Sequence, residues 1–203
     1  MVEKTAKELL THGSIEENFL TEYFVGDLTE DGAIPENLAY IGDGIETVDV
    51  TQEDKKSSKS YYNGGGQETT TVTGSTRSLA FSGDRSFGDP AQDLIAALAD
   101  QTGASRNKWF RENNFTIGDS GKLELTESRT GTVTFSDITD KGGNATDPGS
   151  FKATASYTSK PTVIKATDEG AAEKLATVLT ETPSINAVIL GKEAGVKGAP
   201  AGE

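Results

Sequence analysis

Residues 45–101 decide the fold: IETVDVTQEDKKSSKSYYNGGGQETTTVTGSTRSLAFSGDRSFGDPAQDLIAALADQ. The stretch opens with Ile45–Gln52, in which valines alternate with polar residues as in a half-buried strand. A polar excursion over Glu53–Gln67 follows, and the Thr-rich extended run Glu68–Phe81 brings the chain back. We therefore expect a long, mobile loop between two strands, which reaches out to a neighbour rather than enclosing an active site.

The excursion is too polar to contribute to a hydrophobic core. Its three glycines make it flexible, but no Lys-Ser/Thr pair and no helix follow them, so a phosphate-binding loop is not indicated. Its two tyrosines either form contacts with a partner or face the core as strand residues, because tyrosine combines a large apolar area with a polar tip. The candidate contact residues are Lys55, Lys56, Lys59, Tyr61, Tyr62, Gly64, Gly65 and Gly66.

A helix is predicted over Pro90–Gln101. Asp89 stands at the N-cap, Pro90 at the first helical position, and Gln92 three residues after the cap, as in a capping box. Gly103 provides a stop. One apolar stripe, which we expect to pack on the core, is formed by Ala91, Leu94, Ile95 and Leu98.

Shorter patterns predict the remaining elements. Extended segments are expected at Phe19–Val25, Leu38–Ile41, Arg106–Phe115 with Trp109 on the core side, Lys122–Leu125, Gly131–Ser136, Phe151–Tyr157, Lys160–Ile164 and Asn186–Leu190. Helical patterns are weaker, at residues 2–10 and at Ala171–Leu179. Gly191–Glu203 reads as a flexible tail.

Composition favours a β protein with long loops. Of 203 residues only 33% are apolar, and 23 are glycine. The net charge is −13, and residues 1–53 carry most of it, with 13 Asp/Glu against Lys4 and Lys7. Because nucleic-acid binding relies on a cationic surface, tight binding of DNA or RNA is disfavoured. The charge alone is explained by solubility.

The sequence offers little catalytic chemistry. There is no cysteine, which excludes disulfides and cysteine-based zinc sites, and His12 is the only histidine, which excludes histidine clusters. We expect no cofactor, no metal and no enzymatic activity, although a carboxylate pair among 32 acidic residues stays open. Met1–Leu10 lacks the apolar core of a signal peptide, and the longest apolar run, Leu94–Ala99, is too short to span a bilayer. We therefore expect no membrane association and a soluble protein in a reducing compartment.

Four short motifs occur in a suggestive order: Ile-Gly-Asp-Gly at 41–44, Phe-Ser-Gly-Asp-Arg at 81–85, Asp-Pro-Ala at 89–91 and Gly-Ser-Phe-Lys-Ala-Thr-Ala at 149–155. Over roughly Glu22–Ile164 their order resembles the major tail tube proteins of long, non-contractile-tailed, siphovirus-type bacteriophages.

That resemblance implies a mainly β (α+β) fold, a β-sandwich or half-barrel with one flanking helix, a long strand-connecting loop and terminal arms. It implies an N-terminal arm at 1–20, a tail-tube β domain at 21–165 with loop 53–67 and helix 90–101, and a C-terminal segment and arm at 166–203. Such subunits form stacked hexameric rings that conduct genome DNA into the host. The implied partners are the chain itself, tail-tip or initiator, tape-measure and tail-terminator proteins, and double-stranded DNA in non-specific passage. The implied location is the virion tail, assembled in the host bacterial cytoplasm.

The uneven charge adds a hypothesis. Lys55, Lys56 and Lys59 either dock on the acidic region 1–53 of the next ring, which would guide register, or simply solvate the loop. Three other functions compete with a tail tube. One is a monomeric β-sandwich binding or adhesin module that stacks ligands on Tyr61, Tyr62 or Trp109, another is a carboxylate-based hydrolase, and the third is another ring-forming virion part such as a tail terminator or head–tail connector.

Overall fold

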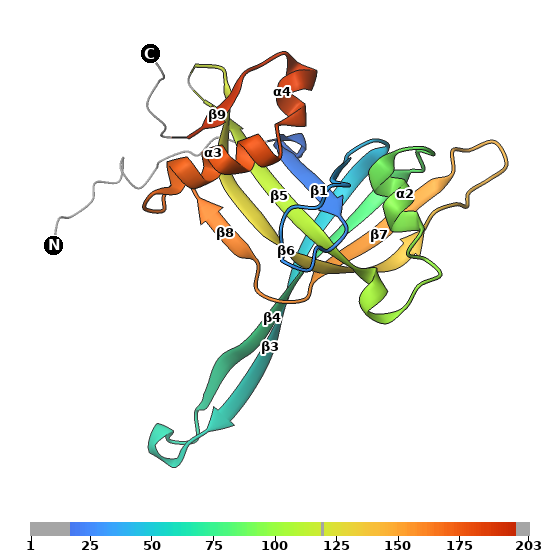
Figure 1. The fold of residues 1–203 in the computed structure, drawn as a ribbon. Helices are drawn as coiled ribbons and strands as arrows, with labels where there is room; N and C mark the ends of the chain where they lie inside the picture. Colours follow the sequence, from blue (N-terminus) through green and yellow to red (C-terminus); the bar gives the residue numbers. More distant parts are fainter. Residues whose placement is uncertain (1–16, 119, 198–203) are drawn as a thin grey trace.

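The computed structural model describes residues 17–118 and 120–197 (Figure 1). Its strands form one sheet in the order β2-β1-β5-β6-β7-β4-β3, while β8 and β9 also pair with β6. Every pairing is antiparallel except that of β9 with β6. The strands are β1 Thr21–Gly26, β2 Ala39–Ile41, β3 Ile45–Ser60, β4 Glu68–Asp84, β5 Asn107–Ile117, β6 Leu123–Thr139, β7 Ser150–Tyr157, β8 Thr162–Lys165 and β9 Ala194–Val196. The prediction of a mainly β fold is confirmed.

Three α-helices accompany the sheet in the described part of the chain; the family resemblance implied one flanking helix, and the sequence pattern predicted a second at Ala171–Leu179, which is confirmed. They are α2 Pro90–Ala96, α3 Ala171–Glu181 and α4 Ile185–Leu190. The predicted cap of α2 is present, because the Asp89 side chain accepts the N–H of Gln92 at 2.7 Å. The helix is shorter than predicted and continues as turns, since Leu98, Ala99 and Gln101 each donate to the carbonyl three residues before them instead of four.

The organising stretch is a long β-hairpin. The predicted loop 53–67 is wrong over residues 53–60, which belong to β3; only residues 61–67 connect the strands, through a 3-10 turn at Tyr62–Gly64. β4 pairs with β7 from Ser78 to Asp84. On the tip side of Ser78, β3 and β4 pair only with each other. The free part, Gln52–Ser60 with Glu68–Arg77, extends about 30 Å from the body at about 3.3 Å per residue (Figure 1). Thr and Ser suit a ladder that is solvated on both faces.

Two hydrophobic cores lie on opposite faces of the sheet. In β5, Phe110 points into the first core and Phe115 into the second, and side chains an odd number of residues apart face opposite ways. The first core packs under α2 and includes Val25, Ile41, Leu79, Phe81, Ile95, Phe110, Val133, Phe135, Phe151 and Tyr157. The second packs under α3 and includes Leu20, Phe115, Leu123, Leu125, Leu175 and Val178. In β7 the predicted alternation is confirmed, since Phe151, Ala153, Ala155 and Tyr157 are all buried.

Three further predictions differ from the structure. One strand, β6, spans the two predicted at Lys122–Leu125 and Gly131–Ser136, because the polar residues between them pair with β5 and β8. The predicted strand Asn186–Leu190 is helix α4, capped by the Ser184 side chain and ended by Gly191 at φ +61°. The predicted tail contains β9. The helix predicted at 2–10, His12 and residues 198–203 lie outside the described residues.

Candidate functional site

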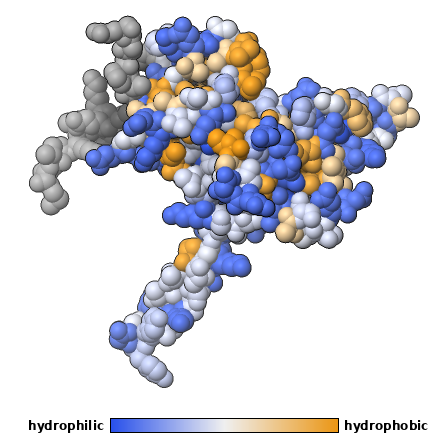
Figure 2. All heavy atoms as spheres, viewed as in Figure 1, coloured by the Kyte–Doolittle hydropathy of each residue, from blue (hydrophilic) through white to orange (hydrophobic). Residues whose placement is uncertain are grey.

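The outer part of the hairpin carries the eight candidate contact residues, with the three lysines on β3 and the tyrosines and glycines at the tip. Tyr62 is fully exposed and Tyr61 is 54% exposed, so these tyrosines do not face the core. Gly65 and Gly66 adopt φ values of +62° and +82°, which favour glycine, and they turn the chain back toward β4. The hairpin surface is largely hydrophilic, with little apolar area (Figure 2). The tip therefore presents two tyrosines to solvent at the end of a two-stranded arm that carries the lysines.

The three lysines do not share one face of the hairpin. Lys56 lies directly opposite Val72, while Lys55 lies opposite Gly74, so Thr73 is an extra, bulged residue. Because side chains alternate along a strand, Lys55 and Lys59 share one face and Lys56 lies on the other. The Lys56 face is the one that continues from Val48 at the first core. A single flat surface cannot contact all three lysines at once.

The root of the hairpin is fixed by a buried ion pair. The Arg77 guanidinium makes two hydrogen bonds to the Glu112 carboxylate, at 2.8 and 3.2 Å. The Tyr157 hydroxyl donates to the same carboxylate at 2.8 Å, and burial beside Glu112 raises the pKa of Tyr157. Burial also raises the pKa of Tyr23 to about 12. The sequence does hold one sign of this ion pair, because Glu112 is a charged residue within the largely buried run Trp109–Phe115. The sequence analysis overlooked it.

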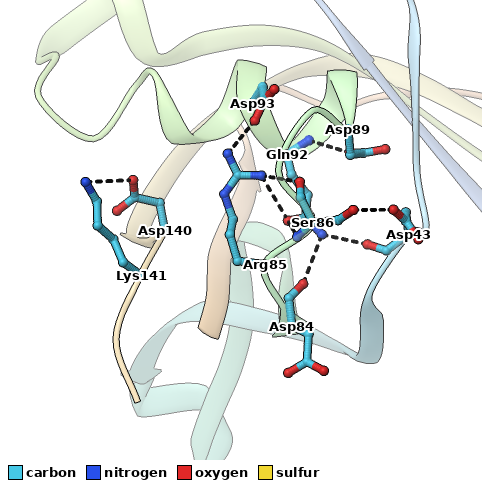
Figure 3. A network of polar contacts seen from close by, with 9 residues as sticks. All are labelled: Asp43, Asp84, Arg85, Ser86, Asp89, Gln92, Asp93, Asp140 and Lys141. Carbon is cyan, nitrogen blue, oxygen red and sulfur yellow. Dashed lines mark hydrogen bonds and ion pairs between the residues drawn. The ribbon is translucent and has the colours of Figure 1, made fainter. Parts of the chain in front are cut away.

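A second polar network ties α2 to the hairpin strands (Figure 3). The Gln92 side chain, which is 1% exposed, donates to the carbonyls of Asp43 and Asp84 at 2.6 and 3.2 Å. It accepts the N–H of Ser86 at 2.8 Å. Arg85 completes the network with an ion pair to Asp93. Gln92 therefore joins the start of β3, the end of β4 and the first turn of α2 at one point.

A groove of about 1000 Å³ opens beside the hairpin root. Residues of β1, β5 and β6 form its floor, and Ile45–Val50 of β3 form one wall. The Arg77–Glu112 pair lines it from within. The exposed acidic residues Glu17, Glu46 and Asp49 also belong to its lining, and no ion pair joins any of the three to another described residue. Sequence reasoning missed this groove because its residues are far apart in the chain.

The C-terminal helices cover a buried polar layer on the opposite face. One Glu22 oxygen accepts from the Ser184 hydroxyl and the Asn186 N–H, both at 2.7 Å, while the other finds no partner among the described residues. Burial raises the pKa of Glu22. Nearby, Arg111 forms an ion pair with Glu181 at 3.0 Å and stacks on Trp109.

Trp109 is buried, as the sequence predicted. Because it is only 5% exposed and covered by Arg111, it offers no free platform for ligand stacking. A binding module would have to rely on the two tyrosines of the hairpin tip.

One broad face of the sheet carries small hydroxyl side chains. On β4, β7 and β6 it presents Ser78, Ser156 and Thr134, opposite the first core. Ser78 and Ser156 share a hydrogen bond of 2.8 Å, and Thr134 donates to Asn107 at 2.6 Å. The same face also carries Lys152, which lies opposite Ser82 toward the start of β7.

Metal and membrane features are lacking in the ranges that the structure describes. Over 17–118 and 120–197, no three His, Cys, Asp or Glu side chains are grouped so that they could hold a metal ion. No helix in these same ranges is long and apolar enough to cross a bilayer.

Comparison with known proteins finds likeness in structure only. No protein-family model and no curated protein matches the sequence. A chain in the tail of an empty GTA particle with C6 symmetry aligns with a TM-score of 0.51 and 12% identity, over 73% of this chain and 98% of that one. A chain of the sheath–tube complex of an extracellular contractile injection system, PVC, aligns at 0.48 and 14%, over 80% and 99%. A chain of the tube-terminating cap of the anti-feeding prophage aligns at 0.47 and 12%, over 77% and 95%. At such identities the first likeness shows that this chain shares the fold of that tail chain.

Proposed function

We propose that this protein is a structural subunit of a phage-like tail tube, where it assembles with copies of itself into stacked hexameric rings. The observation that carries the proposal is the fold shared with a tail chain that is arranged with C6 symmetry. The order of the four sequence motifs favours a long, non-contractile tail within that class. The role is structural, without a catalytic step.

The hairpin is suited to join one ring to the next. Its free part adds nothing to either core, yet it is a regular ladder of about 30 Å, which keeps its tip in a defined place. Contact would be made through Lys55, Lys56, Lys59, Tyr61, Tyr62, Gly64, Gly65 and Gly66. β2 and β3 are the two edge strands of the sheet. Within a ring, each could pair with an edge strand of a neighbouring subunit, which would remove the aggregation hazard of an open edge.

The hydroxyl-bearing face is suited to line a DNA channel. Serine and threonine side chains offer phosphates no strong positive charge, so a duplex would slide without adhering. The net charge of −13 adds a weak repulsion. The same proposal includes the passage of DNA and contact with tail-tip, tape-measure and terminator proteins. It also includes assembly in a host cytoplasm into the tail of a virion.

Electron microscopy of the purified protein over a range of concentrations, with light scattering for mass, tests this function. Wild-type protein is expected to form rings and tubes with a central channel. A variant in which Lys56–Thr73 is replaced by an Asn-Gly turn, so that two residues join the paired Lys55 and Gly74, is expected to form rings that do not stack. A monomer at every concentration, also after addition of a phage tail-tip complex as an initiator, would favour the binding module instead.

A further inference from the structure

We propose that the pocket between helix α3 and the sheet binds a small amphiphilic carboxylate, such as a short aliphatic acid. The pocket has a volume of about 370 Å³, which is within the range of small-molecule sites. Its walls come from α3, β5, β6 and β8, which lie next to one another in the fold (Figure 1). The inference is independent of the tail-tube function, because neither strand of the hairpin and no residue of β2 lines the pocket.

The charged side chains of the pocket leave an excess of positive charge. Arg111 on β5 and Lys174 on α3 are cationic, and Glu181 is the one carboxylate in the lining, so two positive charges and one negative charge give a net charge of +1. The chain as a whole carries −13, which makes a positive pocket distinctive. A ligand with a single negative charge would balance this site, whereas a dianion would exceed its charge.

Arg111 is held in a position from which it can bind a carboxylate. Its Nε donates to the Thr130 hydroxyl at 2.9 Å, and its guanidinium lies 4.9 Å from the centre of the Trp109 ring. Its Nη1 already pairs with the Glu181 carboxylate at 3.0 Å, and a planar guanidinium suits planar carboxylates. Burial nevertheless lowers the pKa of Arg111, so this ion pair compensates the buried charge only in part, and a second anion would be stabilised there.

Apolar side chains in the same pocket offer a place for an aliphatic chain. Val178 on α3 is buried in the second core, and Ile164 on β8 packs against that core; both also line the pocket. At roughly 30 Å³ for each water molecule, the pocket has room for about twelve waters, and therefore for an acid of about six to eight carbons. Cationic and apolar groups that share one pocket of this size match a ligand with a carboxylate at one end and a short hydrocarbon chain at the other.

Trp109 provides the readout for a first test, because it is the only tryptophan in the chain and is stacked on Arg111. Sodium octanoate is titrated into the wild-type protein while the fluorescence of Trp109 is recorded. We expect a saturable change with half-saturation at about 1–10 mM, as for a ligand of about ten non-hydrogen atoms. The uncharged 1-octanol and the cationic octylammonium ion are the controls, and both should bind at least about tenfold more weakly, because they lack the charge-assisted contact.

Three results of these titrations would count against the proposal. The absence of a saturable response to octanoate would overturn it, and so would equal responses to octanoate and 1-octanol. Tighter binding of octyl phosphate than of octanoate would overturn the assignment of a carboxylate.

Two substitutions on α3 should shift the affinity for octanoate in opposite directions. Lys174→Gln removes a positive charge and is expected to raise the half-saturation concentration about threefold, whereas Glu181→Gln removes the competing carboxylate and is expected to lower it about threefold. Lys141→Gln, in the loop between β6 and β7, removes the same charge as Lys174→Gln but lies outside the pocket, so it should leave the affinity unchanged.

Both pocket substitutions should preserve the fold, since Lys174 is exposed and Glu181 is partly exposed; circular dichroism checks this. If the two residues served only to stabilise the fold, the affinity for octanoate would stay unchanged, or would fall in both variants. Either of these results would overturn the proposal.

Discussion

Arg77 on β4 and Glu112 on β5 are joined at 2.8 Å, although β6 and β7 lie between their strands in the sheet. In a flat sheet three strand spacings, about 14 Å, would separate them. Their contact therefore requires the sheet to curl strongly around the face that carries the first core. Because Arg77 is the last β4 residue before the pairing with β7 begins, the ion pair also fixes where the hairpin leaves the body.

Replacement of Glu112 should both destabilise the fold and loosen the hairpin. Glu112→Gln leaves Arg77 without a countercharge, and we expect the free energy of unfolding to fall by about 2 kcal/mol, less than for a fully buried pair because Arg77 is 26% exposed. Denaturant unfolding measures this change. Spin labels on cysteines at Ser60 and Thr180 should report a broader distance distribution between tip and body.

The exposed pair of Lys122 and Glu193 serves as the control. Glu193→Gln should leave the unfolding midpoint and the label distances close to wild type, since exposed ion pairs contribute little. If Glu112→Gln behaved like Glu193→Gln, the curl of the sheet would not depend on the Arg77 contact.

Gln92 should be essential for joining α2 to the hairpin strands. Gln92→Leu keeps a buried side chain of similar size but leaves the carbonyl of Asp43 and the N–H of Ser86 without their partner. We expect a loss of about 2–3 kcal/mol in the free energy of unfolding, because buried polar groups left unpaired are costly. Thermal and denaturant unfolding measure it, with Asp100→Asn on the surface as the control; a loss below that of the control would contradict this role.

Glu22 should make stability depend on pH. Burial raises its pKa above the ordinary 4.5, so the folded state holds a proton that the unfolded state has already released. The contribution of Glu22 to stability therefore falls as pH rises from about 4.5 and levels off above the folded pKa. Glu22→Gln removes this dependence, and its stability relative to wild type should increase over that range. A difference between the two proteins that stays constant with pH would contradict the assignment.

The hydroxyl-bearing face should become adhesive when it is made basic. Ser156→Lys is expected to leave tubes intact but to make them retain linear duplex DNA at low salt, with release as salt rises. Co-sedimentation of labelled DNA with tubes measures this. Thr180→Lys, on exposed α3, adds the same charge elsewhere and should retain less DNA. Equal retention by both variants would place the channel on another face.

Local patterns predicted much of the fold. The alternation of β7, the cap at Asp89 and the burial of Trp109 each follow from neighbouring residues alone. The distal hairpin did not follow, because a strand solvated on both faces lacks the apolar alternation by which strands are recognised. Helix α4 was mistaken for a strand, since a run of six residues is too short to separate the two periodicities.

The candidate site was predictable only in part. The tip residues stand together in the sequence, so their grouping was expected. The split of Lys55 and Lys56 between two faces depends on register, and the ion pair of Arg77 with Glu112 depends on how far the sheet curls. Neither property is encoded within one local stretch.

A cryo-EM reconstruction of wild-type assemblies would test the central claim most directly. The account predicts six-fold rings stacked into a tube, a channel wide enough for a DNA duplex and lined by Ser78, Ser156 and Thr134, and each hairpin reaching an adjacent ring. A protein that stays monomeric even with a tail-tip initiator present, or a tube with these residues on its outer wall, would contradict it.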